Sequence, residues 1–478
     1  MVRIAVAEGD GIGPEIMRSV LRVFEAAQVP VEPVFVEMGL SVWERGVSAG
    51  ITEEARKTIE EIGILLKGPM ATPKGGGVKS INVTARKTWN TFANKRIFKT
   101  LRGVPRARYQ HPDVDITMIR ENIEDTYGAI EHMQTHDVAQ CRRLITRPGS
   151  EQVARYALEV AHRKGARRVT VGHKANIMKL TDGLFLDTFY EVAKEYPDLA
   201  VDDRIVDALA MELVMKPQEF DVVVLPNLQG DILSDLCAGL VGGLAYAPAA
   251  NIGEHIAIFE AVHGTAPDIA GQGIANPTAL LLSACILLRH IGMVEWADQI
   301  EDATQVALRK ALRAPDLASA TKFSTEGFTD QVVEVLQALP RVDAGPRELP
   351  NHITSRPVRT EQRMMESPTP QSKTTRGVDL FIDSPRPPAE IAEVVNAACL
   401  DGMQVTMISN RGTQVWPTGS VFTDCVNHHR VRVEADSAIE QGVIFDVARR
   451  VSATERVCSL EALVRLDDQD GFSLAQGQ

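Results

Sequence analysis

Over its first 340 residues, the sequence alternates short apolar runs with longer segments of helical periodicity, and this pattern leaves few folds open. We expect strands at Val2–Ala7, Asp115–Ile119, Arg168–Gly172 and Asp221–Leu225, and a helix over Pro14–Ala27 after the first of them. Apolar strands that alternate with helices form a largely parallel sheet whose two faces are covered by helices. We therefore predict an α/β fold for this part of the chain.

The composition changes after residue 340. Six prolines lie among charged and small polar residues between Pro340 and Arg376, which is typical of a linker or an extended arm. From Gly377 onward the strand and helix patterns follow the order βαββαβ, which is the order of a ferredoxin-like sandwich. We expect this last segment to form a small α+β domain of its own.

Charge and composition exclude several classes of protein. The chain has 63 acidic and 51 basic residues and a net charge of −12, which argues against a general nucleic-acid binder. Its longest apolar stretch, Ala279 to Leu288, is about half the length needed to cross a membrane. Acidic residues interrupt the N-terminus before a signal peptide could form, and the six cysteines show no CxxC pair. We expect a cytoplasmic protein with no membrane segment.

A glycine-rich turn follows the first expected strand, at Gly9-Asp10-Gly11-Ile12-Gly13. Pro14 occupies the position of the third glycine of GxGxxG, so the dinucleotide-binding fingerprint is not satisfied. We interpret the segment as a tight turn from strand to helix, with Asp10 as a residue that could still line a cofactor cleft.

Residues 73–112 hold ten Lys or Arg and no Asp or Glu. Ser80 is suited to cap a helix, and Asn82 and Arg86 would then lie one turn apart on the same helical face. Helix amides beside a guanidinium form a site for anions. Two arginines could add donors for carboxylates: Arg96 and Arg120. The alternative interpretation is a solvated basic face.

A second group of candidates is acidic. Asp231 and Asp235 lie one turn apart near the start of a helix, and Asp207 stands just before another helix. Carboxylate oxygens are the ligands that Mg²⁺ and Mn²⁺ prefer, although helix capping and the helix dipole explain the two aspartates equally well. Asp207 is an N-cap or a third ligand.

Lys174 and Tyr127 are candidates for proton transfer. Lys174 follows the strand at Arg168–Gly172, where α/β folds place their ligands, and it becomes a base only if its pKa falls well below about 10.4. A solvated lysine and a packed or surface tyrosine are the alternatives.

Seven segments, in their order along the chain, carry a family resemblance: EGDGIGPE (8–15), LKGPMATPKGGG (66–77), SINVTAR (80–86), RENIEDTYGAIEH (120–132), HKANIMK (173–179), NLQGDILSD (227–235) and FEAVHGTAPDIAGQGIANP (259–277). Over about residues 1–340 the sequence resembles the β-decarboxylating dehydrogenase family, and within it the isocitrate dehydrogenases. Residues 377–478, with MISNRGTQVWP (407–417), resemble the C-terminal extension of the long bacterial form.

The resemblance implies an isocitrate/isopropylmalate dehydrogenase-like fold and an obligate homodimer with active sites between protomers, with a higher oligomer through the C-terminal domain as a further option. The expected parts are a large domain of residues 1–92 and 242–340, a small domain of 93–127 and 149–241, an intersubunit clasp segment at 128–148, a linker at 341–376 and a C-terminal domain at 377–478.

The resemblance also implies roles for individual residues. The substrate carboxylates would be held by Ser80, Asn82, Arg86, Arg96 and Arg120, and Mg²⁺ or Mn²⁺ by Asp207, Asp231 and Asp235. Lys174 would take the hydroxyl proton, Tyr127 would protonate the enolate, and Lys174 and Asp207 would reach in from the partner subunit. The cofactor would contact Thr72, Asn176, His263, Gly264, Asp268, Ile269 and Asn276.

Substrate and cofactor follow from two short motifs. The polar Ser80-x-Asn82 suits a third carboxylate, so we expect oxidative decarboxylation of isocitrate to 2-oxoglutarate and CO₂, in the tricarboxylic acid cycle. NADP-dependent members usually have Lys-Tyr where this chain has Asp268-Ile269, and residues 313–321 lack the Tyr and Arg that help hold the phosphate. An aspartate there repels a 2′-phosphate and accepts hydrogen bonds from ribose, so we predict NAD.

Three alternatives remain open. The first is NADP dependence, and the second is another malate-like substrate such as homoisocitrate, isopropylmalate or tartrate. The third is a non-catalytic regulatory subunit, which predicts the loss of a catalytic aspartate, lysine or tyrosine, and none of these is missing here.

Overall fold

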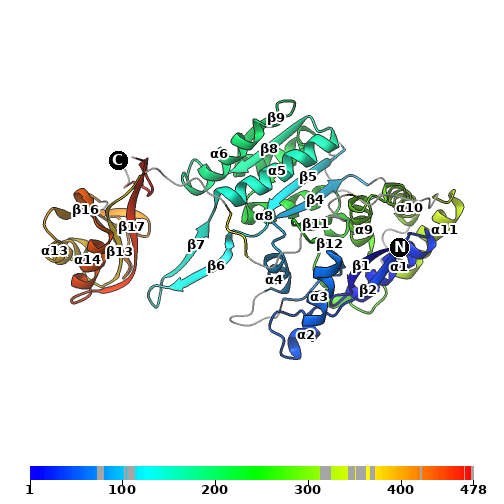
Figure 1. The fold of residues 1–478 in the computed structure, drawn as a ribbon, viewed down its shortest axis with the longest axis horizontal. Helices are drawn as coiled ribbons and strands as arrows, with labels where there is room; N and C mark the ends of the chain where they lie inside the picture. The colour runs from blue at the N-terminus through cyan, green and yellow to red at the C-terminus, as the bar shows by residue number, and fades with distance from the viewer. Residues whose placement is uncertain are drawn as a thin grey trace. The chain divides into compact units, whose positions relative to one another are not determined.

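The computed structural model describes residues 1–72, 80–101, 104, 113–312, 324–342, 350, 362–365, 372–419, 422–467 and 469–474. The chain forms two compact units (Figure 1). The first consists of residues 1–127 and 145–364, and the second of residues 128–144 and 365–478.

A ten-stranded mixed sheet organises the described part of the first unit, in the order β2-β1-β3-β12-β11-β4-β5-β10-β8-β9. Its strands are β1 (Val2–Ala7), β2 (Val31–Phe35), β3 (Ile64–Lys67), β4 (Ala93–Lys99), β5 (Asp115–Glu121), β8 (Arg168–His173), β9 (Ala200–Ile205), β10 (Val222–Leu225), β11 (Pro248–Ile252) and β12 (Ala257–Ala261). Both flanks are parallel, whereas β12, β11, β4 and β5 pair antiparallel at the centre. The predicted α/β fold with a largely parallel sheet is therefore confirmed.

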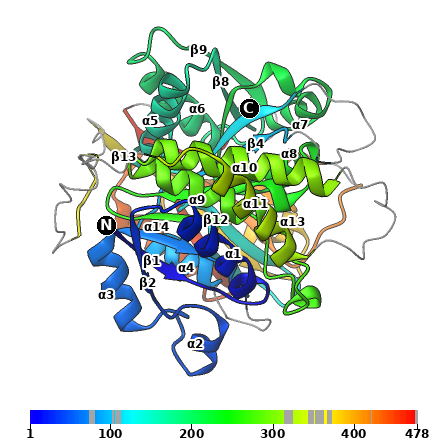
Figure 2. The same cartoon turned by 90° about the vertical axis from the view of Figure 1, so that its right-hand side faces the viewer.

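Helices cover both faces of this sheet: α1 (Gly13–Ala26), α2 (Leu40–Glu44), α3 (Glu53–Ile62), α4 (Ile81–Thr88), α5 (Arg147–Lys164), α6 (Thr181–Ala193), α7 (Val206–Met215), α8 (Asn227–Leu240), α9 (Thr278–His290), α10 (Val294–Leu312) and α11 (Thr325–Ala338). Three short 3₁₀ turns join them: η1 (Pro217–Glu219), η2 (Leu244–Tyr246) and η3 (Pro267–Ile269). Figure 2 shows α9, α10 and α11 lying side by side.

Strand β10 illustrates why the strands are apolar throughout. Val222 and Val224 belong to a core with α5 and α6, whereas Val223 and Leu225 belong to a core with α7 and α8. Successive residues of a strand point to opposite faces, so a strand between two helical layers needs apolar residues at every position.

The glycine-rich turn after β1 is tight, as predicted. Gly9 has φ +78°, and a Cβ atom there would lie 2.3 Å from the Pro69 carbonyl oxygen. The Asp10 carboxylate accepts hydrogen bonds from the amides of Leu40 (3.0 Å) and Ala71 (2.8 Å). These bonds join three loops at the carboxyl ends of neighbouring strands.

The second unit contains β13 (Lys373–Asp383), α13 (Pro388–Ala398), β14 (Met403–Asn410), β15 (Thr413–Trp416), β16 (His429–Ile439), α14 (Gln441–Val451), β17 (Arg456–Leu466) and β18 (Gln469–Asp470). The sheet order β15-β14-β16-β13-β17-β18 places the four long strands antiparallel in the ferredoxin-like order, as predicted. The same unit includes most of the hairpin of β6 (Asp125–Met133) and β7 (Ala139–Leu144). The Ser459 hydroxyl in β17 donates to the Gln134 side chain beyond β6, at 3.0 Å.

Most of the proline-rich segment 341–376 lies outside the described residues, and β13 begins at Lys373, within the expected linker. Among the residues that the structure describes, no helix is long and apolar enough to cross a membrane.

Candidate active site

Two buried arginines lie on neighbouring strands at the centre of the sheet. Arg96 in β4 and Arg120 in β5 both bind the carboxylate of Asp231, which projects from α8. Asn227, at the start of α8, accepts two further bonds from Arg120, at 2.7 and 3.0 Å. Arg96 is 5% exposed and Arg120 is 1% exposed, so these guanidinium groups are held in fixed positions.

This arginine pair creates a strongly positive local field. Burial, together with the positive charges of Arg120 and Arg86, lowers the pKa of Arg96 to about 10. The Arg96 guanidinium stays charged at neutral pH. Arg96 and Arg120 therefore share the single negative charge of Asp231. Such an arrangement favours additional anions, because they reduce the repulsion between the cations.

Tyr127 shares the Asp231 carboxylate with the arginines. Its hydroxyl donates to Asp231 at 2.7 Å, and the Arg120 guanidinium lies 4.8 Å from the centre of its ring. Burial and the bond to Asp231 raise the pKa of Tyr127. Burial would also raise the pKa of Asp231, but Arg120, Tyr127 and Arg96 outweigh it and lower that pKa. The phenol therefore holds its proton beside an ionised carboxylate.

A small polar cavity of about 100 Å³ adjoins this cluster. Asn82 and Arg86 line it from one face of α4, as their spacing predicts, together with Arg96 and the loop residues His263 and Gly264. The Asn82 Oδ1 atom and the His263 Nε2 atom are buried with no hydrogen-bond partner among the described residues. These polar atoms are available to a ligand.

Ser80 occupies the N-cap position of α4, as predicted, although its side chain makes no cap hydrogen bond. Its hydroxyl oxygen instead accepts a bond of 3.2 Å from the Thr72 hydroxyl. This contact brings a residue expected to bind substrate together with one expected to bind cofactor.

A buried ion-pair network beneath the cavity was not predicted from sequence. Glu260 in β12 accepts hydrogen bonds from Lys67 (2.5 Å), Arg86 (3.1 Å) and Asn251 (2.7 Å). Burial alone would raise the pKa of Glu260, but the two cations outweigh it and lower the pKa strongly. The sequence signal for this network was a single charged residue in each of two otherwise apolar strands, Lys67 in β3 and Glu260 in β12. Charged residues are rarely buried without a partner of opposite charge.

Lys174 and Asp207 form a pair of their own. The Lys174 ammonium, in the turn after β8, donates to the Asp207 carboxylate at the start of α7. This bond lowers the pKa of Asp207. Asn176 lies exposed in the same turn.

The three predicted metal ligands do not assemble within one chain. Asp231 and Asp235 share a face of α8, and Asp235 lies 4.0 Å from Arg96. Burial raises the pKa of Asp235. In the described ranges, no group of three His, Cys, Asp or Glu is placed to hold a metal ion. One protomer therefore holds Asp231 and Asp235 together on α8, whereas its Asp207 is paired with Lys174.

The remaining predicted cofactor residues lie in the loop between β12 and α9. Asp268 is exposed in η3, beside the partly buried Ile269. The Asn276 side chain accepts a hydrogen bond of 3.0 Å from the amide of Thr278, the first residue of α9. Burial lowers the pKa of His263 in this loop. Residues 313–321, which also bear on cofactor choice, lie outside the described residues.

Both parts of the chain match described families. Residues 3–332 match the isocitrate/isopropylmalate dehydrogenase family, and residues 373–478 match the bacterial isocitrate dehydrogenase C-terminal domain. A Thermus thermophilus relative named isocitrate dehydrogenase (NADP) is 40% identical over 99% of this chain and 96% of its own length.

Two further relatives cover different shares of the chain. A Saccharomyces cerevisiae protein named isocitrate dehydrogenase (NAD) subunit 2, mitochondrial, is 45% identical over 70% of this chain and 90% of its own length. A crystal structure of a Thermus thermophilus protein superposes with a TM-score of 0.90 at 40% identity, covering 100% of this chain and 96% of that one. The chain therefore belongs to the isocitrate/isopropylmalate dehydrogenase family, in the form that ends in the bacterial isocitrate dehydrogenase C-terminal domain.

Proposed function

We propose that this protein oxidises and decarboxylates isocitrate to 2-oxoglutarate and CO₂ while reducing a nicotinamide nucleotide, the reaction used in the tricarboxylic acid cycle. The observation that carries the proposal is the convergence of Arg86, Arg96 and Asn82 on one small cavity, where Arg96 also contacts the Asp231 carboxylate that binds Tyr127. A substrate with three carboxylates needs several cationic groups in fixed positions. The guanidinium of a buried arginine can donate two hydrogen bonds to one carboxylate, and little side-chain entropy is lost because the arginine is already held in place.

The residues divide the chemistry between them. Arg86, Arg96 and Asn82 bind and orient the carboxylates, while Arg120 holds Asp231 in place. Tyr127, with its raised pKa, donates a proton to the carbon left by decarboxylation. Lys174 accepts the proton of the substrate hydroxyl when hydride leaves for the nicotinamide.

A divalent cation fits the residues present. Asp231 and Asp235 offer carboxylate oxygens on one face of α8, and Asp207 offers a third on an exposed surface. Oxygen-only ligands suit Mg²⁺ or Mn²⁺. When bound, such a cation would polarise the substrate's hydroxyl and carbonyl oxygen as a Lewis acid.

We further propose that two copies of the chain complete each active site. Helix α7, which carries Asp207, exposes Met211, Val214 and Met215, and α8 exposes Leu228 and Ile232. The two helices pack against each other, so these exposed apolar side chains lie on neighbouring elements. A second copy covering them would bring its own Asp207 and Lys174 towards Asp231.

Replacing Met215 with aspartate is therefore expected to shift the protein from dimer to monomer and to remove activity, because the change places a charge among these apolar side chains. Size-exclusion chromatography with light scattering would measure the mass, and initial rates the activity. The matched control is Phe35→Asp, which places the same charge on an apolar side chain of similar exposure (60% against 64%) in β2. An active Met215→Asp dimer would contradict the shared site.

For the cofactor we propose NAD. The support is Asp268, whose exposed carboxylate would repel a 2′-phosphate and accept bonds from ribose hydroxyls. The relatives that span the whole chain are named for NADP, whereas NAD-named relatives match only about 70% of it.

Initial rates with isocitrate, Mg²⁺ and either nucleotide would test the proposal, with EDTA and isopropylmalate as controls. We expect turnover with isocitrate, higher kcat/KM for NAD than for NADP, and loss of activity with EDTA. Asp268→Lys should shift the NADP-to-NAD ratio of kcat/KM upward at least tenfold, and Glu53→Lys, a surface control, should not. A wild-type preference for NADP would overturn the cofactor assignment alone, and turnover only of isopropylmalate would overturn the substrate.

A further inference from the structure

The sheet that carries the active site has a second cavity on its opposite face. Strand β4 directs Asn94 and Arg96 to the active-site cavity, whereas Lys95, Ile97 and Lys99 line a separate cavity of about 670 Å³. Strand β12 likewise directs Glu260 to the active-site cavity and Phe259 to the larger cavity. Because successive strand residues alternate between faces, the two cavities lie back to back across one sheet. We call the larger one the reverse-face cavity.

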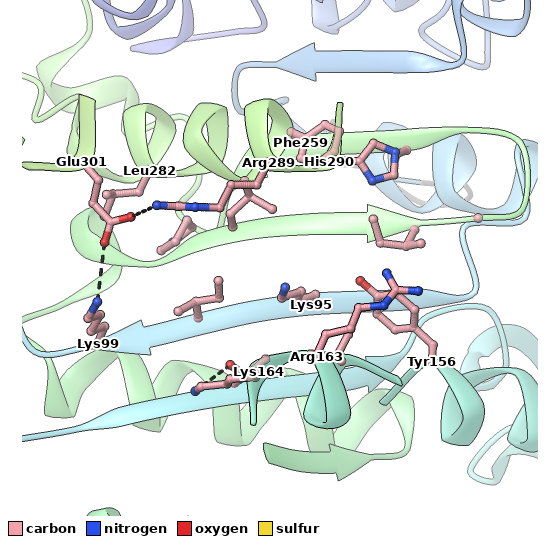
Figure 3. Close-up of a pocket in the computed structure, with 18 of the residues that line it drawn as sticks. Lys95, Lys99, Tyr156, Arg163, Lys164, Phe259, Leu282, Arg289, His290 and Glu301 are labelled. Atoms are coloured by element: carbon pink, nitrogen blue, oxygen red, sulfur yellow. Dashed lines mark hydrogen bonds and ion pairs between the residues drawn. The ribbon is translucent and has the colours of Figure 1, made fainter. Parts of the chain in front are cut away.

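Helices α5, α9 and α10 close the reverse-face cavity over the sheet (Figure 3). The lining contains five basic side chains, Lys95, Lys99, Arg163, Lys164 and Arg289, against three acidic ones, Asp115, Glu254 and Glu301. A cavity of this size holds a small organic ligand. Its charge excess points to an anion.

Most of these cations are already paired. Arg289 binds Glu301 and Asp298, each at 2.7 Å, Lys164 binds Asp115 at 2.7 Å, and Lys99 lies 3.7 Å from Glu301. Arg163 contacts Glu159 at 3.3 Å.

Lys95 differs from the other cations of the cavity. Throughout the described ranges, no hydrogen bond or ion pair is found for its ammonium group (Figure 3). Burial, and then the charges of Lys164, Arg289 and Arg163, lower its pKa to about 8. A lysine held among other cations without a carboxylate is costly unless an anion neutralises it.

The rest of the lining suits an apolar body attached to that anion. Leu282 and Ile286 line the cavity from α9 and Ile97 lines it from β4, and Ile256 extends the same surface. Both ring nitrogens of His255 are buried with no hydrogen bond among the residues described, and Nε2 lies 3.8 Å from the Glu254 carboxylate. They could serve as further contacts for polar atoms of a ligand.

We propose that the reverse-face cavity binds an amphipathic organic anion, with its carboxylate, sulfonate or phosphate on Lys95 and its apolar part on Ile97, Leu282 and Ile286. Lys95 lies between Asn94 and Arg96, so an occupant that shifts β4 also shifts a guanidinium of the active-site cavity. Binding of the anion to the reverse-face cavity is independent of the proposed function. Only the expected change in affinity for isocitrate rests on that function.

The binding test uses 1-anilinonaphthalene-8-sulfonate, an aromatic monoanion whose fluorescence rises in apolar surroundings. We expect about one saturable site per chain in the full-length protein. Lys95→Met should weaken binding about tenfold, because one charge-assisted contact is lost. Arg86→Met, a cation-to-Met change on the opposite face, should leave the dissociation constant within about twofold.

A neutral analogue, N-phenyl-1-naphthylamine, separates charge recognition from apolar contact, and its affinity should be the same in wild type and Lys95→Met. Lys95 is only partly buried and its ammonium makes no ion pair among the described residues, so Lys95→Met should not lower the melting temperature; folding is checked in the same samples. The proposal would be overturned if Lys95→Met bound the sulfonate as tightly as wild type. It would also be overturned if only Arg86→Met lost affinity for the sulfonate. Loss of isocitrate turnover in wild type with intact sulfonate binding would overturn the proposed function alone.

Discussion

Lys174→Met is expected to lower kcat for isocitrate by about 10²- to 10⁴-fold, the usual contribution of a positioned acid or base. The side chain keeps its length but loses the amine that would accept the hydroxyl proton. Substrate affinity, measured by quenching of intrinsic fluorescence, should change little, because the carboxylates bind to other residues. Lys179→Met, an exposed lysine five residues further on, is the matched control and should retain activity.

A mixing experiment separates a shared active site from one built within a single chain. Lys174→Met and Tyr127→Phe are each expected to be nearly inactive. If the base comes from the partner subunit, a hybrid dimer of the two variants has one site with both residues intact. Unfolding and refolding the variants together should then restore about a quarter of wild-type activity, because half of the dimers are hybrids with one working site. No recovery beyond the separate variants would contradict the shared site.

Glu260→Leu is expected to destabilise the protein by about 3–5 kcal/mol, the cost of breaking a buried ion pair from one side. The change leaves Lys67 and Arg86 without their carboxylate, and Lys67 is 1% exposed. Urea unfolding followed by circular dichroism would measure the loss. The double variant Lys67→Met, Glu260→Leu should recover part of it, since the cation is then also removed.

The cost of Glu260→Leu should also depend on pH. The pKa of Glu260 is lower in the folded protein than in the unfolded chain, so its stabilising effect is present above about pH 4.3 and is lost as pH falls below that value. The difference between wild type and variant should therefore shrink in acid. An equal difference at pH 7 and pH 3 would mean that the carboxylate charge does not stabilise the fold.

The local elements were predictable because they depend on short runs of sequence. The strand at Val2–Ala7 has the predicted bounds, and the helix over Gly13–Ala26 differs by one residue at each end. The ferredoxin-like order of the C-terminal segment also follows from its alternating apolar residues, such as Val378, Leu380 and Ile382 in one core. Periodicity suffices where one face of an element is buried.

The arrangement of the site was less predictable, because lateral strand order decides it. The basic run at residues 73–112 is compatible with an anion site or with a solvated basic face, yet its described part divides between the two faces of the sheet, with Arg96 on one and Lys95 on the other. The pairing of Lys67 with Glu260 joins strands almost 200 residues apart. No local pattern indicates that β12 lies beside β3.

Strand β4 contributes side chains to cavities on both faces of the sheet, so both cavities depend on which of its residues point to each face. Inserting a single residue before Asn94 would exchange odd and even positions, turning Arg96 towards α5 and α9 and Lys95 towards Asp231. Two inserted residues would restore the original facing. An odd change in the length of β4 would therefore disrupt both cavities together, whereas an even change would leave each side chain on its original face.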